Sequence, residues 1–204
     1  MNRRKFLKST AAITTVSMVG GNAFAQNPQK LKMDKNIGKD MILLANETAW
    51  PGIKHTADKL KSGTYGIDAM VEGINFVEAE PTVRSVGYGG WPNLLGVMEF
   101  DGGVMDGSTR SVGSVGALKH TYHAAQVARA VMTKLNHVML TGDGADLFAA
   151  EIGLPKLNTL LEDSKQVWMA KLKEILSPEQ FEKFPNIPLA PLNNAITDPE
   201  KVRD

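Results

Sequence analysis

Residues 96–118 read GVMEFDGGVMDGSTRSVGSVGAL, and this stretch decides the fold class of the chain. Two short apolar pieces lie beside turn-forming Asp-Gly and Gly-Gly pairs, which is typical of successive antiparallel strands. Glycine inside a strand also lets another backbone or a ligand approach closely. The stretch therefore predicts a glycine-rich antiparallel sheet in the middle of the chain.

Helical and strand-like segments surround this stretch. Apolar side chains recur at helical spacing in five segments, residues 53–63, 66–81, 121–135, 145–153 and 159–176. Two short apolar runs, residues 41–46 and 137–141, predict buried strands, and a loop is expected at 47–52. Because the order is neither strict strand–helix alternation nor all-helical, we expect an α+β fold with helices layered outside sheets.

The first 25 residues predict a bacterial export signal. Arg3 and Arg4 open a basic segment, a weakly apolar stretch of 11 residues follows, and small residues stand at Ala23 and Ala25. The tandem arginines indicate the twin-arginine route, so a periplasmic or secreted location is expected. The apolar stretch is well short of the ~20 residues that span a bilayer, so no membrane anchor is expected.

Two polar segments frame the expected domain at residues 41–176. Residues 26–40 are polar and aperiodic, as in a flexible leader. Residues 177–204 hold five prolines in 28 positions, which favours an extended or disordered linker over a packed element.

Charge and composition exclude several classes of function. Removal of the signal takes four of the 23 basic residues away and leaves 19 against 22 acidic ones, a formal charge of −3. A nucleic-acid-binding protein shows the opposite balance. Because the chain has no cysteine, disulfides and thiolate metal sites are also excluded.

The histidines and aspartates offer incomplete chemistry. His120 and His123 are three residues apart and in a helix could share a metal, but no third ligand follows that pattern, so no metal site is expected. Asp101 and Asp106 could form a general acid/base pair or cap turns, and capping is the favoured interpretation.

Other motifs also stop short of a catalytic set. The glycine-rich stretches at 87–90 and 142–146 match no phosphate-binding motif, which favours close backbone packing. No G-x-S-x-G elbow is present. Trp50 follows the first predicted strand, at the end of a sheet where binding sites are common. An indole can bind or shape a site, but it cannot cleave a bond.

Six ordered stretches resemble the alpha portion of the glycosylasparaginases, or aspartylglucosaminidases, which are N-terminal nucleophile hydrolases. They lie at residues 48–52, 66–73, 80–96, 104–118, 124–132 and 137–149. The VGYGG at 86–90 with Pro92 is similar to the glycosylasparaginase branch and differs from the plant-type asparaginases and isoaspartyl peptidases. One departure is Gly102, where the family usually has alanine.

The resemblance implies an αββα four-layer sandwich, made as a precursor that cuts itself into alpha and beta chains. The nucleophile would be the threonine at the start of the beta chain, after Asp204, so this chain alone would be inactive. Trp50 matches a tryptophan of the family's substrate pocket. The implied partner is the chain's own beta chain in a dimer of heterodimers, the substrate is a small glycosylated asparagine, and no cofactor is implied.

Several alternatives stay open. The family places His-Asp before the catalytic threonine, whereas this sequence ends in Arg203-Asp204, so Asp204 is the autoprocessing aspartate or the sequence stops just short of the cut. An asparaginase or β-aspartyl peptidase of the same superfamily is a second interpretation. A non-catalytic periplasmic scaffold is a third.

Overall fold

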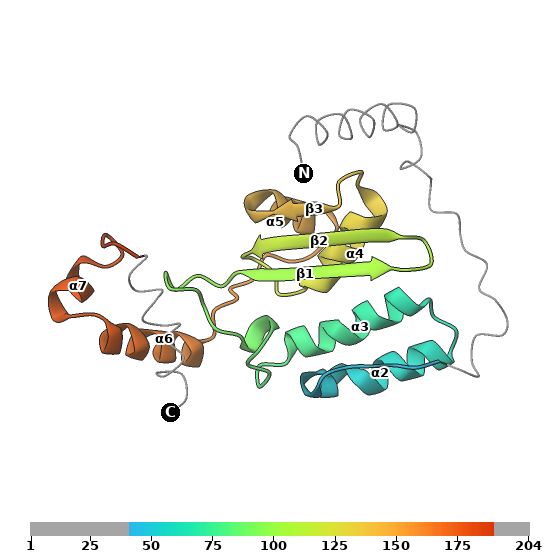
Figure 1. Ribbon diagram of the computed structural model, residues 1–204, viewed down its shortest axis with the longest axis horizontal. Coiled ribbons are helices and arrows are strands. Elements are labelled where there is room, and N and C mark those ends of the chain that lie inside the picture. The colour runs from blue at the N-terminus through green and yellow to red at the C-terminus, as the bar shows by residue number, and fades with distance from the viewer. Residues whose placement is uncertain (1–40, 190–204) are drawn as a thin grey trace, which may run out of the picture. The chain divides into compact units, whose positions relative to one another are not determined.

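The computed structural model describes residues 41–189 and has an α+β fold (Figure 1), which confirms the expected class. Its elements are, in chain order, η1 (Glu47–Ala49), α2 (Trp50–Lys61), α3 (Gly66–Ala79), η2 (Gly87–Gly89), β1 (Phe100–Asp106), β2 (Ser111–Leu118), α4 (Ala124–Lys134), β3 (Met139–Thr141), α5 (Gly142–Glu151), α6 (Glu162–Ile175) and α7 (Pro178–Lys183).

The predicted hairpin forms the centre of a three-stranded sheet in the order β1-β2-β3. Strands β1 and β2 are antiparallel, with Val104 opposite Gly113 and Asp106 opposite Ser111. Strand β3 pairs with β2 in parallel. The described sheet is therefore mixed, and β1 and β3 are its edges.

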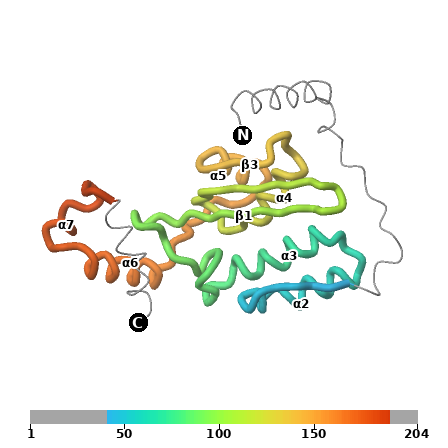
Figure 2. The backbone as a smooth tube through the Cα atoms, viewed as in Figure 1, coloured from blue at the N-terminus to red at the C-terminus, as the bar shows by residue number. Residues whose placement is uncertain are grey.

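Helix α4 covers one face of this sheet, and the tube view shows α4 and α5 behind the strands (Figure 2). The apolar stripe of α4 is buried as its spacing predicts, with Val127, Ala128 and Val131 fully covered. The approach is close enough to require glycine, because a Cβ on Gly113 would lie 2.1 Å from the Ala128 carbonyl oxygen. Close packing of this kind is one reason that the strands are rich in glycine.

Helices α2 and α3 form a second close contact. A Cβ on Gly52 would lie 1.9 Å from the Gly73 carbonyl oxygen, and one on Gly73 would lie 1.8 Å from Thr56 Oγ1. The Thr56 hydroxyl instead donates to the Gly52 carbonyl oxygen at 3.1 Å. This crossing fixes the start of α2, where Trp50 lies.

Helix α6 docks on the loop that precedes the sheet. Arg84 donates to the Gly89 carbonyl oxygen at 3.1 Å, to Ser164 Oγ at 3.2 Å and to the Asp163 carboxylate. The Trp168 indole donates to the Leu94 carbonyl oxygen at 3.0 Å. The loop therefore has no strand of its own, and β1 begins at Phe100, within the stretch at 96–118 that predicts the sheet.

The prediction of a buried strand at 41–46 is wrong. These residues have no regular secondary structure, and Ile42 and Leu44 are 81% and 87% exposed. A strand needs a neighbour that takes its backbone hydrogen bonds, and the sheet described here supplies none beside this segment. The loop expected at 47–52 is also wrong, because η1 and the start of α2 occupy it and Pro51 suits a first helical turn.

Two predictions near the C-terminal half also need correction. The strand expected at 137–141 is only three residues long and lies at an edge, with Met139 52% exposed, and α5 begins directly after it at Gly142. Within the expected linker, Pro178–Lys183 form α7. The sequence Ser-Pro-Glu-Gln builds a capping box there, in which Ser177 Oγ accepts from the Gln180 N–H.

Across the described helices, none is both long enough and apolar enough to cross a membrane.

Candidate functional site

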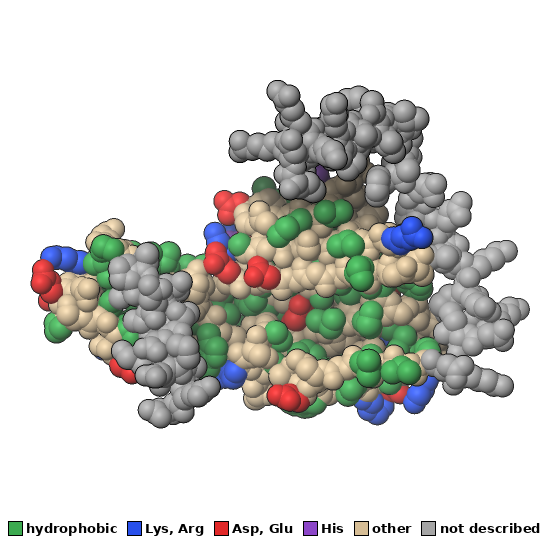
Figure 3. Space-filling view, in the orientation of Figure 1, with side chains coloured by type: hydrophobic (Ala, Val, Ile, Leu, Met, Phe, Trp, Pro, Cys, Tyr) green, Lys and Arg blue, Asp and Glu red, His purple; other side chains and the backbone are tan. Residues whose placement is uncertain are grey.

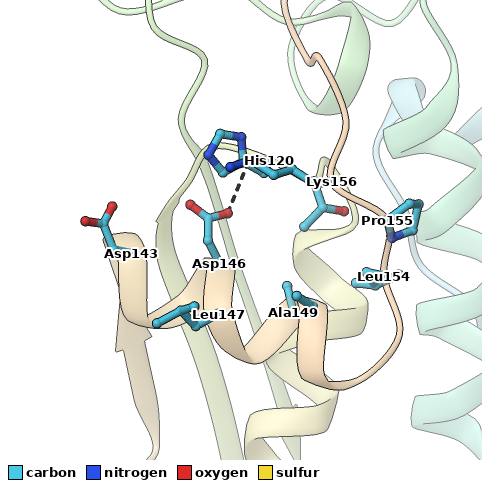
Figure 4. Close-up of a pocket in the computed structure, with 10 residues that line it drawn as sticks. His120, Asp143, Asp146, Leu147, Ala149, Leu154, Pro155 and Lys156 are labelled. Atoms are coloured by element: carbon cyan, nitrogen blue, oxygen red, sulfur yellow. Dashed lines mark hydrogen bonds between the residues drawn. The ribbon is translucent and has the colours of Figure 1, made fainter.

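A cavity of about 300 Å³ opens beside the first turns of α5 (Figure 4). Its wall combines charged and polar side chains with an apolar side. The lining residues are His120, Thr121, Asp143, Asp146, Leu147, Ala149, Ala150, Leu154, Pro155 and Lys156.

The Asp146 carboxylate is the best-anchored polar group of the cavity. Its Oδ1 accepts the backbone N–H of His120 at 3.1 Å and that of Lys119 at 3.2 Å. Asp143 is exposed at the rim and lies 3.8 Å from Lys119 Nζ. Both carboxylates therefore hold the loop that follows β2 more than they present a paired acid and base.

The cavity lacks an activated nucleophile among the residues that line it. Thr121 supplies the hydroxyl there, yet the residue is buried and its Oγ1 faces the backbone N–H of His123 at 3.3 Å. Among residues 41–189, no general base forms a hydrogen bond with that hydroxyl. The cavity can accept a small polar group, but its described lining does not form a complete hydrolytic set.

The two histidines do not act together. Helix α4 begins at Ala124, so His120 and His123 precede it and the spacing argument for a shared metal fails. His120 lines the cavity, whereas His123 faces Glu78. Within residues 41–189, no group of three or more His, Asp or Glu side chains has the geometry of a metal site.

The two aspartates of β1 have separate structural roles. Asp106 Oδ1 accepts the N–H of Ser108 at 2.9 Å and its hydroxyl at 2.7 Å, and Oδ2 accepts from the Tyr65 hydroxyl. Burial alone would raise the pKa of Asp106, but these hydrogen bonds outweigh it and lower that pKa to about 2. The turn-capping prediction is confirmed for Asp106.

Asp101 does not cap a turn, so that half of the prediction is wrong. It lies inside β1, and its Oδ1 accepts the N–H of Ala117 at 2.8 Å. Ala117 has a φ of 53°, and the pairing of β1 and β2 is irregular between Phe100 and Gly102. Asp101 therefore supports an irregular point of the hairpin, where the ladder lacks a regular partner.

The glycine-rich loop at 87–90 packs against backbone, as predicted. Gly87 has a φ of 65°, and a Cβ there would lie 2.2 Å from the Glu78 carbonyl oxygen. A Cβ on Gly89 would lie 2.3 Å from the Val83 carbonyl oxygen. The second glycine-rich stretch behaves differently, because a Cβ added at Gly142 or Gly144 would meet no described atom within 4 Å and both residues belong to the first turn of α5.

The residues assigned a role by resemblance stand apart from the cavity. Trp50 is 62% exposed at the start of α2 and does not line the cavity. Asp204, the expected autoprocessing residue, lies outside the described residues, as do the predicted export signal and leader.

The sequence pattern did not single out the buried carboxyl group of Glu78 on α3. Glu78 is 6% exposed, and burial raises its pKa to about 8 despite hydrogen bonds from the N–H groups of Ala125 and Ala124. The available signal was its helical phase, because Glu78 falls on the same face as Ile67 and Val71. An acidic residue on an apolar stripe indicates a buried polar contact.

Comparison with known proteins places this chain in one family. A model of the asparaginase family matches residues 47–194. An N(4)-(beta-N-acetylglucosaminyl)-L-asparaginase of Elizabethkingia miricola is 36% identical over 193 residues, which is 91% of this chain and 53% of that protein. A putative N(4)-(beta-N-acetylglucosaminyl)-L-asparaginase of Drosophila erecta is 37% identical over 66% of this chain and 33% of its own length.

A second kind of relative carries a different name. An isoaspartyl peptidase/L-asparaginase of Danio rerio is 35% identical over 58% of this chain and 39% of its own length. The chain belongs to the asparaginase family, which confirms the resemblance to the glycosylasparaginases. It spans between a third and about half of the length of these curated relatives.

Proposed function

We propose that this chain is the amino-terminal half of an amidohydrolase that cleaves the amide bond between asparagine and N-linked N-acetylglucosamine. The observation that carries the proposal is the match to the Elizabethkingia relative, which is named for this activity and covers 91% of the chain. That relative is almost twice as long as the matched part. Since the described cavity lining holds no complete hydrolytic set, we place the nucleophile downstream.

The proposed chemistry uses a threonine freed as a new amino terminus by self-cleavage. Its hydroxyl attacks the side-chain amide carbon, and its own α-amino group takes the proton. An oxyanion hole stabilises the tetrahedral intermediate, whose collapse breaks the C–N bond while the α-ammonium group returns the proton to the departing glycosylamine. Water then hydrolyses the acyl-enzyme, which releases aspartate and frees the threonine. Asp204 would stand at the cleaved bond or just before it.

This half would contribute one sheet of a four-layer sandwich. Helices cover one face of the described sheet, and the other face carries Gly103 and Ser114 beside the exposed apolar side chains of Met105 and Met139. Hydrophobic side chains are visible on the face toward the viewer in Figure 3. In sandwiches of this kind, a second sheet packs about 10 Å from the first. The beta chain is the proposed source of that sheet here. Pairing of two such heterodimers remains part of the proposal.

Trp50 is the proposed contact of this half with the substrate. Its indole is largely exposed, and the Gly52–Gly73 crossing holds the start of α2 in place. A fixed, exposed indole suits an apolar or sugar surface because it loses little freedom on binding. In the full-length protein, Trp50→Ala is expected to raise KM more than it slows self-cleavage, and equal losses would indicate a folding role instead.

An L-asparaginase or β-aspartyl peptidase is the second candidate. Relatives in Danio rerio and Rattus norvegicus are named isoaspartyl peptidase/L-asparaginase and are 35% and 34% identical over about 60% of the chain. The first candidate is favoured because the match to the Elizabethkingia relative covers more of the chain at similar identity.

Two measurements test the proposal. The coding sequence beyond codon 204 should show, within about ten codons, a threonine followed by Ile-Gly or Val-Gly. The full-length protein should then split at that threonine and release aspartate from N-acetylglucosaminyl-asparagine with a higher kcat/KM than from asparagine or an isoaspartyl dipeptide. A stop codon at 205 with no partner gene nearby would leave the non-catalytic scaffold as the better interpretation.

Export is a separate proposal that rests on the first 25 residues. Lysine substitutions at Arg3 and Arg4 together should stop appearance of the protein in the periplasm if the twin-arginine route is used. Unchanged export would contradict that route.

A further inference from the structure

A carboxyl group and an imidazole face each other between the end of α3 and the start of α4. Glu78 Oε2 and His123 Nδ1 lie 3.8 Å apart, and the Glu78 side chain is 8% exposed. Both atoms are buried, and within residues 41–189 neither has a hydrogen-bond partner. Buried polar atoms are normally paired, so two that face each other across a short gap need an explanation.

The other oxygen of Glu78 fixes the carboxyl group in place. Its Oε1 accepts the N–H of Ala125 at 3.0 Å, in the first turn of α4. His123 is the N-cap of that helix and provides no side-chain cap. Glu78 therefore supplies from α3 the side-chain acceptor that the N-terminus of α4 otherwise lacks.

The glycine-rich loop Gly87–Gly90 packs against Glu78 directly and against His123 through two tyrosine rings. Gly87 packs against the Glu78 carbonyl oxygen, where only a residue without a side chain fits. The Tyr88 ring lies 5.1 Å from that of Tyr122, whose ring lies 4.6 Å from His123. One anchor of the loop is thus the backbone of Glu78, and the other reaches His123 through two aromatic rings.

Proton counting distinguishes the possible states of the pair. With no proton, two acceptors face each other, and with two protons, two donors do. With one proton, either O–H can donate to nitrogen or N–H can donate to oxygen, and both buried atoms are satisfied once a side-chain movement closes the gap from 3.8 Å to about 3 Å. We propose that Glu78 and His123 share one proton and that this proton holds the loop Gly87–Gly90 against the start of α4.

The other polar side chains between α3 and α4 pair with each other and form no hydrogen bond with Glu78 Oε2 or His123 Nδ1. Asn75 donates to Gln126, and neither carries charge. Asp68 and Arg129 form an ion pair of their own at 2.7 Å. The phenols of Tyr88 and Tyr122 complete the surroundings on the loop side.

The pH dependence follows from the two shifts. The pKa of Glu78 is raised by burial, so the stability that its proton gives is lost as pH rises toward about 8. The pKa of His123 is lowered by burial, so its contribution is complete above the ordinary value of 6.5 and is lost as pH falls through the folded value. Between pH 6.5 and 8 only the Glu78 contribution changes.

Hydrogen exchange on the full-length protein tests the proposal. In the wild type, protection of the amides in Gly87–Gly90 and at Ala125, corrected for intrinsic exchange, should fall by up to tenfold per pH unit between pH 6.5 and 8. Glu78→Gln should remove this slope, because a glutamine amide donates to His123 without releasing a proton. Glu80→Gln is the matched control and should keep the slope, since Glu80 is an acid two residues away whose pKa is lowered.

Equal slopes in the wild type and in Glu78→Gln would overturn the proposal. His123→Asn gives a second reading should Glu78→Gln not fold. Loss of the imidazole should move the midpoint of the wild-type slope, and an unchanged midpoint would also overturn the shared proton.

Discussion

The two faces of the β1–β2–β3 sheet differ in what covers them. On the face toward α4, Val104, Val115 and Leu118 are at most 8% exposed. On the opposite face, Met105 and Met139 are 69% and 52% exposed. The same strands therefore contribute to a finished core on one side and leave apolar side chains in water on the other.

This difference shows which face of the sheet the described residues bury by themselves. The covered face is made by a helix that lies close in sequence to the hairpin, so its apolar spacing and the glycines of the strands agree. The open face has no such neighbour among the described residues. Exposed apolar area of this kind is worth about 25 cal/mol per Å² when it becomes buried, which favours a partner.

The largest effect is expected for Gly113→Ala on the covered face. The new Cβ would lie 2.1 Å from the Ala128 carbonyl oxygen and 2.5 Å from the Met132 nitrogen, and backbone atoms cannot rotate away. We expect a loss of about 3 kcal/mol or more in the free energy of unfolding, measured by urea denaturation of the full-length protein.

Gly103→Ala is the matched control on the open face. Among residues 41–189 its Cβ would have no neighbour closer than 3.9 Å, and a facing sheet about 10 Å away leaves room for a methyl group, so the change should stay within about 0.5 kcal/mol. Similar losses in both variants would mean that the open face is as tightly packed in the full-length protein as the covered one. That result would support the second sheet and remove the contrast.

A medium effect is expected for Met105→Lys in the full-length protein. If the downstream half packs on the open face, this change should lower the free energy of unfolding by about 2 kcal/mol, because an apolar contact is replaced by a charge. Val167→Lys, at an exposed apolar site on α6, is the control and should have little effect. An equal response of both variants would argue against a partner on the open face.

The sequence predicted elements well where local pattern and final contacts agree. The helical spacing of α3 and α4 and the Asp-Gly turn of the hairpin were enough, because those segments pack on each other. The prediction of a strand at 41–46 was wrong because an apolar run does not show whether a neighbouring strand is present to pair with it. Helix α7 was not predicted, because the high proline content of residues 177–204 favoured a linker although Ser177 begins a capping box.

The site was predictable only in part, for a related reason. Capping by Asp106 follows from local turn chemistry, and the sequence indicated it. The Glu78–His123 contact joins residues 45 positions apart, so spacing along one element could not reveal it. The proposed substrate role of Trp50 rests on resemblance alone, since Trp50 does not line the cavity.

The smallest effect on stability is expected at the hairpin turn that joins β1 and β2. Asp106 ties β1 to Tyr65 before α3 and to Ser108 in the turn, and it belongs to neither apolar face. Asp106→Asn keeps one acceptor oxygen but loses the anion, so we expect a loss of about 1 kcal/mol in unfolding free energy at neutral pH. Because the folded-state pKa of Asp106 is depressed to about 2, its contribution is present above the ordinary value of 3.8 and is lost as pH falls toward 2. The wild type and the variant should therefore converge in stability between pH 3.8 and 2. A constant difference across that range would show that the turn does not depend on the charge of Asp106.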